Sequence, residues 1–297
     1  MDVGSFIRLF SLAAIWGAAF LFTRIGAPAL GPVILIEARV GLAALFLAAV
    51  ALLMRRRLNV ATNWKHYLIL GGLNGALPFL LFAFAAQTLS ASVLSVMNAT
   101  APIWGAAIGA VWARRQPDMR TLFGLLLGIS GVAMVVGVDY AVTLHGAMLA
   151  IAAALLAPLS YGIATHYAKS APVVDGFSNA HGSMWAASLM LLPALPFAGT
   201  AGNHGIGLVL AVLSLGIVCT GIAFLLYFRL VRDIGPTGAL TVTFLIPAFG
   251  ILWGHVFLGE PVSAGMIAGS GIIILGTVLV AGFNPAAIVR RLLRNGT

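Results

Sequence analysis

The stretches NATAPIWGA (residues 98–106) and TFLIPAFGI (residues 243–251) indicate how this chain is organised. Each is apolar and carries a proline followed three residues later by a glycine, Pro102 with Gly105 and Pro247 with Gly250. The same offset of 145 positions separates the two prolines and the two glycines. Because proline removes a backbone hydrogen bond and kinks a helix, the matched breaks predict a chain built from two related halves.

The composition around these stretches indicates a membrane protein. Of 297 residues, 61% are hydrophobic and only 8% are charged, whereas a soluble domain carries about 25% charged residues. A helix that spans a bilayer needs about 20 apolar residues. The sequence therefore predicts an all-α integral membrane protein with ten transmembrane helices, near residues 6–25, 33–54, 67–88, 91–112, 121–138, 143–168, 175–197, 205–228, 235–257 and 263–283.

The offset of 145 extends beyond the prolines. Trp16-Gly17 aligns with Tyr161-Gly162, Arg24 with Lys169, Gly71 with Gly216, Phe79-Leu80 with Phe224-Leu225, and Gly124 with Gly269. We therefore expect two five-helix repeats, residues 1–140 and 141–297, that form one transport unit. Because five is odd, the second repeat enters the membrane from the opposite face. Inverted repeats of this kind are a recurring plan of secondary transporters.

The net charge of +9 could suggest a nucleic-acid partner, but its distribution argues against one. With the N-terminus inside, 14 of the 16 basic residues fall on the inner side: Arg8, Arg55, Arg56, Arg57, Lys65, Arg114, Arg115, Arg120, Lys169, Arg229, Arg232, Arg290, Arg291 and Arg294. Cytoplasmic loops carry such an excess of lysine and arginine. We expect both termini to be cytoplasmic, the first segment to be retained as a helix, and nucleic acid not to be a partner.

The motifs resemble those of a known family. They are W-G-x-x-F at Trp16, Gly17 and Phe20, the arginine Arg39, the mid-helix proline Pro102, and Gly259-Glu260-Pro261. The whole chain resembles the drug/metabolite transporter superfamily, and within it the ten-helix type with two EamA repeats. The resemblance implies a bacterial inner membrane protein that exports metabolites or amino acids, including aromatic ones in some members. One departure is Arg115-Gln116-Pro117, where the first repeat should carry an acidic residue before proline.

The matched prolines predict a central cavity between the halves. We expect its lining to include Trp16, Asn74, Pro78, Asn98, Pro102, Tyr161, Thr243 and Pro247. The asparagine amides could bind an amino or carboxylate group of a substrate, or cap a carbonyl that proline frees, or bond another helix. Trp16 and Tyr161 would suit an apolar or aromatic substrate, with core packing as the alternative.

Three ionisable residues are candidates for gating or coupling: Glu37, Arg39 and Glu260. Ionisable side chains at membrane depth are costly and indicate function by default. Glu37 and Arg39 are two positions apart near the outer end of the second segment, so they point to different faces and should not pair. Each either extends to the outer interface or makes a gate contact, with Arg24 or Glu260 as the expected partner.

Other chemistries have no motif in this sequence. Cys219 is the single cysteine, and no GxxxxGK[ST], HExxH or GxSxG pattern occurs, so we expect no catalytic residue, metal or cofactor. No Asp or Glu lies near the centre of a segment, which favours uniport or facilitated diffusion. The alternatives are a proton-coupled metabolite or drug antiporter, through Glu37 or a histidine, and a lipid or metabolite translocator.

The expected substrate is a small neutral or zwitterionic metabolite, because the aromatic and amide residues suggest a cavity without a buried net charge. Amino acids, aromatic ones included, fit both this lining and the resemblance. We expect a monomer in a lipid bilayer to be functional, with a dimer through the glycine-rich segments 121–138 and 263–283 as the alternative.

Overall fold

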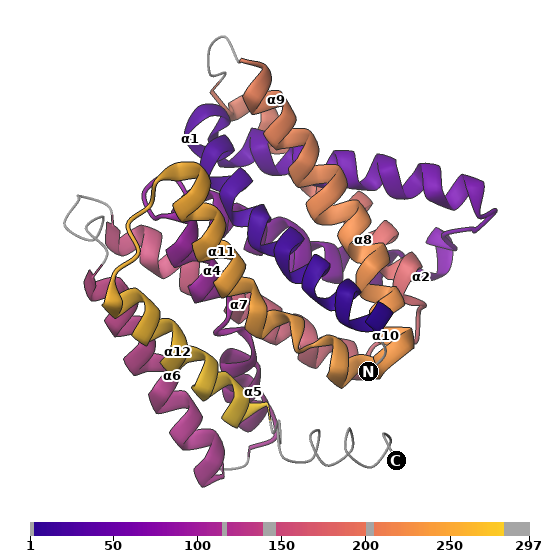
Figure 1. Cartoon of the computed structure of the whole chain (residues 1–297). Helices are drawn as coiled ribbons and strands as arrows, with labels where there is room; N and C mark the ends of the chain where they lie inside the picture. Colours follow the sequence, from indigo (N-terminus) through magenta and orange to yellow (C-terminus); the bar gives the residue numbers. More distant parts are fainter. Residues whose placement is uncertain (1–2, 115–117, 139–146, 200–204, 282–297) are drawn as a thin grey trace.

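A computed structural model describes residues 3–114, 118–138, 147–199 and 205–281, and these residues are helical with no strand (Figure 1). Its elements are α1 (Val3–Leu53), α2 (Val60–Gly71), η1 (Gly72–Ala76), α3 (Leu77–Ala85), α4 (Ala91–Asn98), α5 (Ala101–Trp112), α6 (Met119–Val138), α7 (Ala147–Ser170), α8 (Gly176–Leu191), η3 (Leu192–Phe197), α9 (Ile206–Leu213), η4 (Ser214–Ile222), α10 (Ala223–Ala239), α11 (Val242–Leu258) and α12 (Ala264–Val280). The motif Arg115-Gln116-Pro117 lies outside the described residues, as does the predicted junction near 140.

Six helices or helical runs among the described residues are long and apolar enough to cross a membrane: Val3–Leu53, Val60–Ala85, Ala91–Trp112, Met119–Gly137, Ala147–Ser170 and Ile206–Pro236. The apolar helices α11 and α12 are shorter. The all-helical class and the presence of apolar membrane-length helices agree with the sequence prediction, whereas the count of ten transmembrane helices stays a prediction.

Glycine–proline pairs bend two elements, α1 and α10. In α1, Gly31 has φ 75° and ψ 157° and is followed by Pro32; in α10, Gly235 has φ 78° and ψ 165° and is followed by Pro236. Glycine adopts a positive φ at little cost, and proline suits the first turn of the helix that follows. The bend in α1 falls between the predicted segments 6–25 and 33–54.

Both proline-containing stretches tighten just before the proline. The Ala99 amide donates to the Val96 carbonyl at 3.1 Å, and the Phe244 amide donates to the Thr241 carbonyl at 3.1 Å. These are bonds to the third residue back, and they lie three positions before Pro102 and Pro247. A proline ring clashes with the carbonyl four residues earlier, which explains why the α-helical pattern changes there.

Glycine permits two close helix crossings that are equivalent under the 145 offset. A Cβ atom at Gly17 of α1 would lie 3.0 Å from the Gly250 amide nitrogen of α11, and one at Gly162 of α7 would lie 3.0 Å from the Gly105 amide nitrogen of α5. Gly162 and Gly250 stand 145 positions after Gly17 and Gly105. The crossings α1–α11 and α5–α7 therefore use the same pair of positions from the two halves.

A second equivalent pair joins α6 and α12, which lie side by side (Figure 1). A Cβ at Gly124 would lie 2.8 Å from the Gly276 carbonyl oxygen, and one at Gly269 would lie 3.0 Å from the Gly131 carbonyl oxygen. Such close backbone approach between membrane helices requires small residues. This pair uses the glycine-rich segments that the sequence analysis also considered for a dimer.

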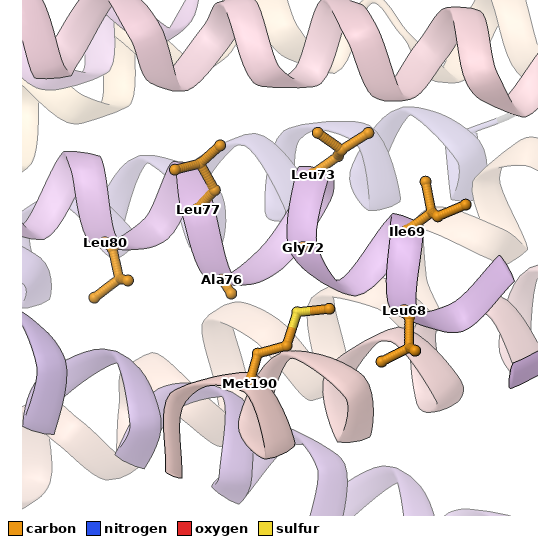
Figure 2. Close-up of a pocket in the computed structure, with 8 residues that line it drawn as sticks. All are labelled: Leu68, Ile69, Gly72, Leu73, Ala76, Leu77, Leu80 and Met190. Atoms are coloured by element: carbon orange, nitrogen blue, oxygen red, sulfur yellow. The ribbon is translucent and has the colours of Figure 1, made fainter. Parts of the chain in front are cut away.

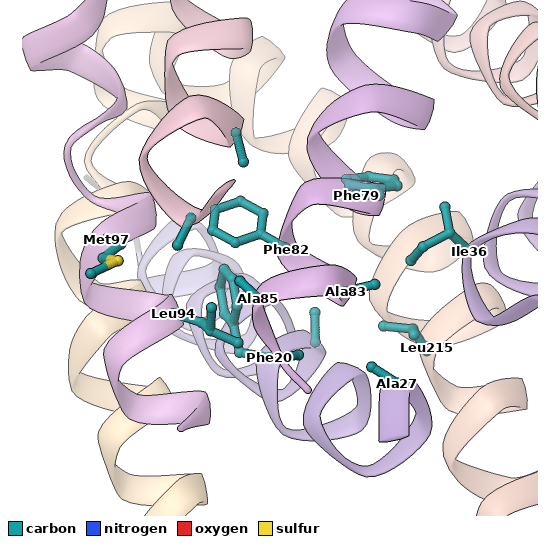
Figure 3. Packing of buried hydrophobic residues seen from close by; sticks show 14 of the residues in the cluster. Phe20, Ala27, Ile36, Phe79, Phe82, Ala83, Ala85, Leu94, Met97 and Leu215 are labelled. Carbon is teal, nitrogen blue, oxygen red and sulfur yellow. The ribbon is translucent and has the colours of Figure 1, made fainter. Parts of the chain in front are cut away.

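The buried core draws on elements from both halves of the chain. Figure 3 shows Phe20, Phe82 and Leu94 meeting at one end of the cluster, with Ile36 and Leu215 at the other. Phe20 and Phe82 make an edge-to-face contact with ring centroids 5.4 Å apart, which is a favoured aromatic geometry. The core thus holds α1, α3 and η4 together around the site described next.

Candidate functional site

A buried guanidinium lies at the centre of the candidate site. Arg39 follows Gly31 by eight residues, about 12 Å along the helix, and is 8% exposed. Its Nε donates to Thr220 Oγ1 at 3.0 Å. Its guanidinium carbon lies 3.5 Å from the ring centroid of Phe79, within the range of a cation–π interaction.

The π-helical segment η4 presents the hydroxyl that holds Arg39. Thr220 Oγ1 accepts from Arg39 and donates to the Leu215 carbonyl, five residues earlier, at 2.9 Å. A Cβ at Gly216 would lie 3.0 Å from the Arg39 carbonyl oxygen and 2.7 Å from Leu42 Cβ. Only glycine allows η4 to approach α1 this closely, and π-helical turns of this kind often mark functional sites.

Further side chains complete the surroundings of Arg39. Tyr161 of α7 and Cys219 of η4 lie within electrostatic range of the guanidinium, and Phe79 comes from α3. The cluster of Arg39, Phe79, Tyr161, Cys219 and Thr220, which we call the Arg39 cluster, therefore combines residues from both halves of the chain.

The Arg39 cluster carries a net positive charge. Among the described residues Arg39 forms no ion pair, and Thr220 is its one hydrogen-bond partner. The sequence analysis placed Arg39 among the gate or coupling residues and not in the cavity lining, and the expected cavity without a buried net charge stays a prediction. Composition did not reveal the charge of the Arg39 cluster, because it depends on the absence of a neighbouring carboxylate in the folded chain.

Glu37 has its own partner on a different helix. Its Oε1 accepts a hydrogen bond from Ser188 Oγ of α8 at 2.6 Å. Its Oε2 is buried and has no hydrogen-bond partner among the described residues. Glu37 and Arg39 thus contact different elements, as their spacing implied.

The expected contact of Glu37 or Arg39 with Arg24 or Glu260 is absent from the described structure. Arg24 Nη1 donates to the Ala86 carbonyl. Glu260 is 9% exposed, and its carboxylate accepts from the Ala91 amide at 2.7 Å, from the Ser92 amide at 2.9 Å and from Ser92 Oγ. The amides at the start of α4 have no partner within the helix, so the carboxylate caps α4, and its negative charge interacts favourably with the positive end of the helix dipole.

The aromatic and amide residues predicted for the cavity have varied surroundings. Trp16 is half-buried and faces Tyr227, with ring centroids 5.5 Å apart. Asn74 is exposed within η1, and Asn98 is half-buried at the end of α4. Thr243 Oγ1 donates to the Leu240 carbonyl at 2.8 Å, so its hydroxyl supplies a hydrogen-bond donor to a carbonyl of the irregular turn before α11.

Two of the predicted prolines lie in the first turn of a helix, and the third lies in a helix interior. Pro78 is buried in the first turn of α3, Pro102 is half-buried in the first turn of α5, and Pro247 is buried inside α11. Of the eight predicted cavity residues, Tyr161 lies within electrostatic range of Arg39.

Sequence reasoning did not select Phe79, Cys219 or Thr220 as site residues. The signal for Phe79 was available, because Phe79-Leu80 recurs as Phe224-Leu225 at the 145 offset. Thr220 and Cys219 had no comparable signal, since neither lies in a matched motif.

An open apolar depression has no residue of the Arg39 cluster in its lining. It has a volume of about 510 Å³ and is lined by Leu68, Ile69, Gly72, Leu73, Ala76, Leu77, Leu80 and Met190. Figure 2 shows Met190 of α8 reaching toward the helical run from Leu68 to Leu80. None of the predicted site residues lines it, and its apolar side chains offer no partner to a charged solute group.

The family models that match this chain are those of the EamA-like transporter family, over residues 5–137 and again over residues 148–282. A solved structure described as "Crystal structure of protein" is similar with a TM-score of 0.66 and 17% identity, over 98% of this chain and 99% of that chain. At this identity the likeness shows a shared fold.

Curated relatives carry transporter names. An "Uncharacterized transporter" of Archaeoglobus fulgidus is 24% identical over 269 residues, covering 89% of this chain and 94% of the relative. The "Uncharacterized inner membrane transporter YedA" of Escherichia coli K12 is 24% identical, covering 93% and 90%. A "Probable terminal-alkyne amino-acid exporter" of Streptantibioticus cattleyicolor is 24% identical, covering 89% of each chain. These names indicate a transporter rather than an enzyme.

Proposed function

The chain belongs to the EamA-like transporter family, and from this premise we propose that it exports small neutral or zwitterionic metabolites by alternating access. Amino acids, including aromatic ones, are the proposed substrates. The observation that carries the proposal is the repetition of helix crossings at the 145 offset, Gly17 with Gly250 and Gly162 with Gly105. Two equivalent halves around one interior can exchange roles and expose a single site to each side of the membrane in turn.

The repeat organisation is part of this proposal. Ten spans in two inverted repeats, residues 1–140 and 141–297, are supported by the two family matches and by the Gly31 and Gly235 bends. The distribution of basic residues supports cytoplasmic termini. A relative named as an inner membrane transporter supports placement in a bacterial inner membrane. One chain contains both halves of the Arg39 cluster, which supports a functional monomer.

The proposed substrate class rests on two further observations. One relative is named as an amino-acid exporter. Phe79 and Tyr161 of the Arg39 cluster offer aromatic surface, and elsewhere in the bundle the Trp16 ring contacts Tyr227. Aromatic side chains favour edge or offset contact with another ring.

Counterflow in proteoliposomes tests the proposal. Vesicles that contain the purified full chain are loaded with one unlabelled amino acid, and uptake of trace labelled phenylalanine is followed at equal pH. We expect transient accumulation with aromatic loads and none in protein-free vesicles. If no amino acid, loaded singly, produced accumulation of the label, the amino-acid assignment would be overturned. Movement of a labelled lipid analogue in the same vesicles would instead support a translocator.

Proton coupling is a second candidate, because Glu37 Oε2 is buried without a hydrogen-bond partner among the described residues. A buried carboxylate oxygen without a partner is costly when charged, so binding a proton would relieve it. An imposed pH gradient tests this directly. Coupling predicts uptake driven by the gradient and lost in Glu37→Gln, with the exposed Asp118→Asn as matched control. Equal uptake with and without the gradient would support uniport.

A further inference from the structure

We propose that the Arg39 guanidinium is the carboxylate anchor of the transport site, so that a transported solute must carry a carboxylate group. This inference rests on the proposed transport function and narrows its substrate class. Neutral solutes and amines without a carboxylate would then be excluded, although the fold alone admits them.

The terminal nitrogens of Arg39 are the atoms that carry the proposal. Nε donates a hydrogen bond to Thr220 Oγ1, and the two terminal nitrogens make no hydrogen bond to the residues that the structure describes. They are not among the buried side-chain atoms that lack a partner. Each of them therefore keeps a small surface that protein atoms do not cover, although the whole residue is only 8% exposed.

The two contacts of Arg39 fix the orientation of its plane. Thr220 holds the Nε edge at 3.0 Å, and the Phe79 ring covers one face at 3.5 Å. The edge formed by the two terminal nitrogens makes no hydrogen bond to a described residue. This edge presents parallel N–H groups that match the two oxygens of a carboxylate, which is the strongest geometry for such a pair.

The charge of the Arg39 cluster calls for an anion. An ionisable group at membrane depth is costly when it lacks a partner, and no described carboxylate neutralises Arg39. A solute carboxylate would supply the missing charge. The preference for a carboxylate thus comes from the positive charge of Arg39, which no described residue neutralises.

The equivalent place in the other half of the chain is apolar. At the 145 offset, Arg39 corresponds to Met184 and Thr220 to Gly75. The same contact recurs there, because a Cβ at Gly75 would lie 3.3 Å from Met184 Cε. Met184 is buried in the core, so the cation is a feature of one half of the chain and has no counterpart at the equivalent place in the other half.

Competition on the unmodified chain is the first test. Labelled phenylalanine counterflow is challenged with 3-phenylpropionate, which keeps the carboxylate and lacks the ammonium, and with phenylalaninamide and phenethylamine, which lack the carboxylate. We expect inhibition by phenylpropionate and, at equal concentration, inhibition weaker by about tenfold or more from the other two. Equal inhibition by phenylalaninamide would overturn the inference and leave the transport proposal standing.

Variants of Arg39 form the second test. Arg39→Met introduces the residue that stands at the equivalent position of the other half, Met184, and replacing a buried charge by an apolar side chain of similar volume is often tolerated by the fold. We expect Arg39→Met to lose phenylalanine counterflow by at least about tenfold and to lose its preference for phenylpropionate over phenylalaninamide. Arg39→Lys should retain that preference with a raised KM. Wild-type transport and selectivity in Arg39→Met would overturn the inference.

Failure of the transport proposal is distinguishable from failure of the anchor. If no amino acid supports counterflow, thermal unfolding of the full chain in detergent with 3-phenylpropionate or phenethylamine tests the anchor alone. A stabilising shift with the carboxylate, absent with the amine and absent in Arg39→Met, would support the anchor without amino-acid transport. No shift with the carboxylate would overturn the anchor as well.

Discussion

The guanidinium carbon of Arg39 lies 3.5 Å from the ring centroid of Phe79, so a charge on α1 stacks on an aromatic face of α3. The contact joins the bent second part of α1 to the helix that follows η1. It also covers one face of the cation and directs its hydrogen-bonding capacity into the plane of the guanidinium. The five predictions that follow begin with this contact.

Replacing Phe79 with leucine should weaken both the fold and the site. Phe79→Leu keeps apolar volume but removes the ring, and a desolvated cation–π contact contributes about 2 kcal/mol. We expect a loss of about 1–3 kcal/mol in the free energy of unfolding, measured by chemical denaturation in detergent. Phe224→Leu is the matched control, because Phe224 is the equivalent residue and stacks on Phe228 at 6.1 Å. A double-mutant cycle with Arg39→Met should show coupling for Phe79 and none for Phe224.

Thr220→Val should destabilise the chain and misorient Arg39. Valine keeps the shape but removes the hydroxyl that accepts from Arg39 and donates to Leu215. An unsatisfied buried donor costs about 1–3 kcal/mol, and we expect that loss in the free energy of unfolding together with a raised KM for substrate. Thr220→Ser keeps the hydroxyl and should behave like the wild type. An unchanged KM in Thr220→Val would show that Nε does not need this partner.

Gly17→Ala and Gly162→Ala should both be destabilising, by about 1–3 kcal/mol each. The added Cβ would lie 2.7 Å from Phe249 Cβ in the first case and 3.0 Å from the Gly105 nitrogen in the second. Gly105→Ala is the control, since a Cβ there meets nothing within 4 Å. Thermal unfolding of the three variants checks this. Equal stability of all three variants would mean that the helices at these two crossings can move apart without a loss of stability.

Glu260→Gln should loosen the start of α4. Glutamine presents one N–H₂ group where the carboxylate accepts from Ala91, Ser92 and the Ser92 hydroxyl, so at least one buried donor loses its acceptor. The expected loss is about 1–3 kcal/mol in the free energy of unfolding, with faster hydrogen exchange at the first amides of α4. Glu37→Gln is the comparison, because Glu37 accepts from one side chain, Ser188. Unaltered exchange at α4 would contradict the capping role.

The stability of the helix α8 start should depend on pH through Asp175. Burial acts to raise the pKa of Asp175, but hydrogen bonds from Ser178 and the charge of Arg56 outweigh it, so the pKa is lowered in the folded chain. A lowered folded pKa means that this stabilisation is complete above the unfolded pKa of about 3.9 and is lost as the pH falls through the folded value.

Thermal unfolding between pH 3 and pH 7 tests this dependence. Asp175→Asn retains an N-cap side chain without the charge, so the wild type should be more stable near neutral pH, by less than about 1 kcal/mol for an exposed pair. The difference should shrink as the pH falls below about 4. Arg56→Gln should reduce the same difference. A constant difference across this range would contradict the assignment.

Several features were predictable from local sequence. The helical class follows from long apolar segments, which in a membrane must satisfy their backbone groups internally. The glycine–proline pair at Gly31 and Pro32 lies between two predicted segments, and the structure bends there. Family membership was also predictable, since short motifs in a fixed order span the chain. The ten-helix count and the role of each cavity residue stay predictions.

The charged site was not predictable in the same way. Glu260 and Arg39 looked equivalent as ionisable residues at segment ends, yet one caps α4 and the other lies inside the bundle. A sequence window contains no information on which carboxylate or hydroxyl approaches a given arginine in space. In the described residues Arg24 and Glu260 have other partners, and the gate role of Glu37, Arg39 and Glu260 stays a prediction.

By itself the sequence determined the membrane class, the family and the repeated positions of proline and glycine, because composition and spacing act along the chain. Only the tertiary structure decided that Arg39 meets Thr220, 181 positions away, and that no described carboxylate neutralises it. The physical reason is that this contact depends on the close approach of η4 to α1 at Gly216 and on the wider turn of a π-helical segment, whose hydrogen bonds join residues five apart. Both are properties of packed helices and not of local sequence.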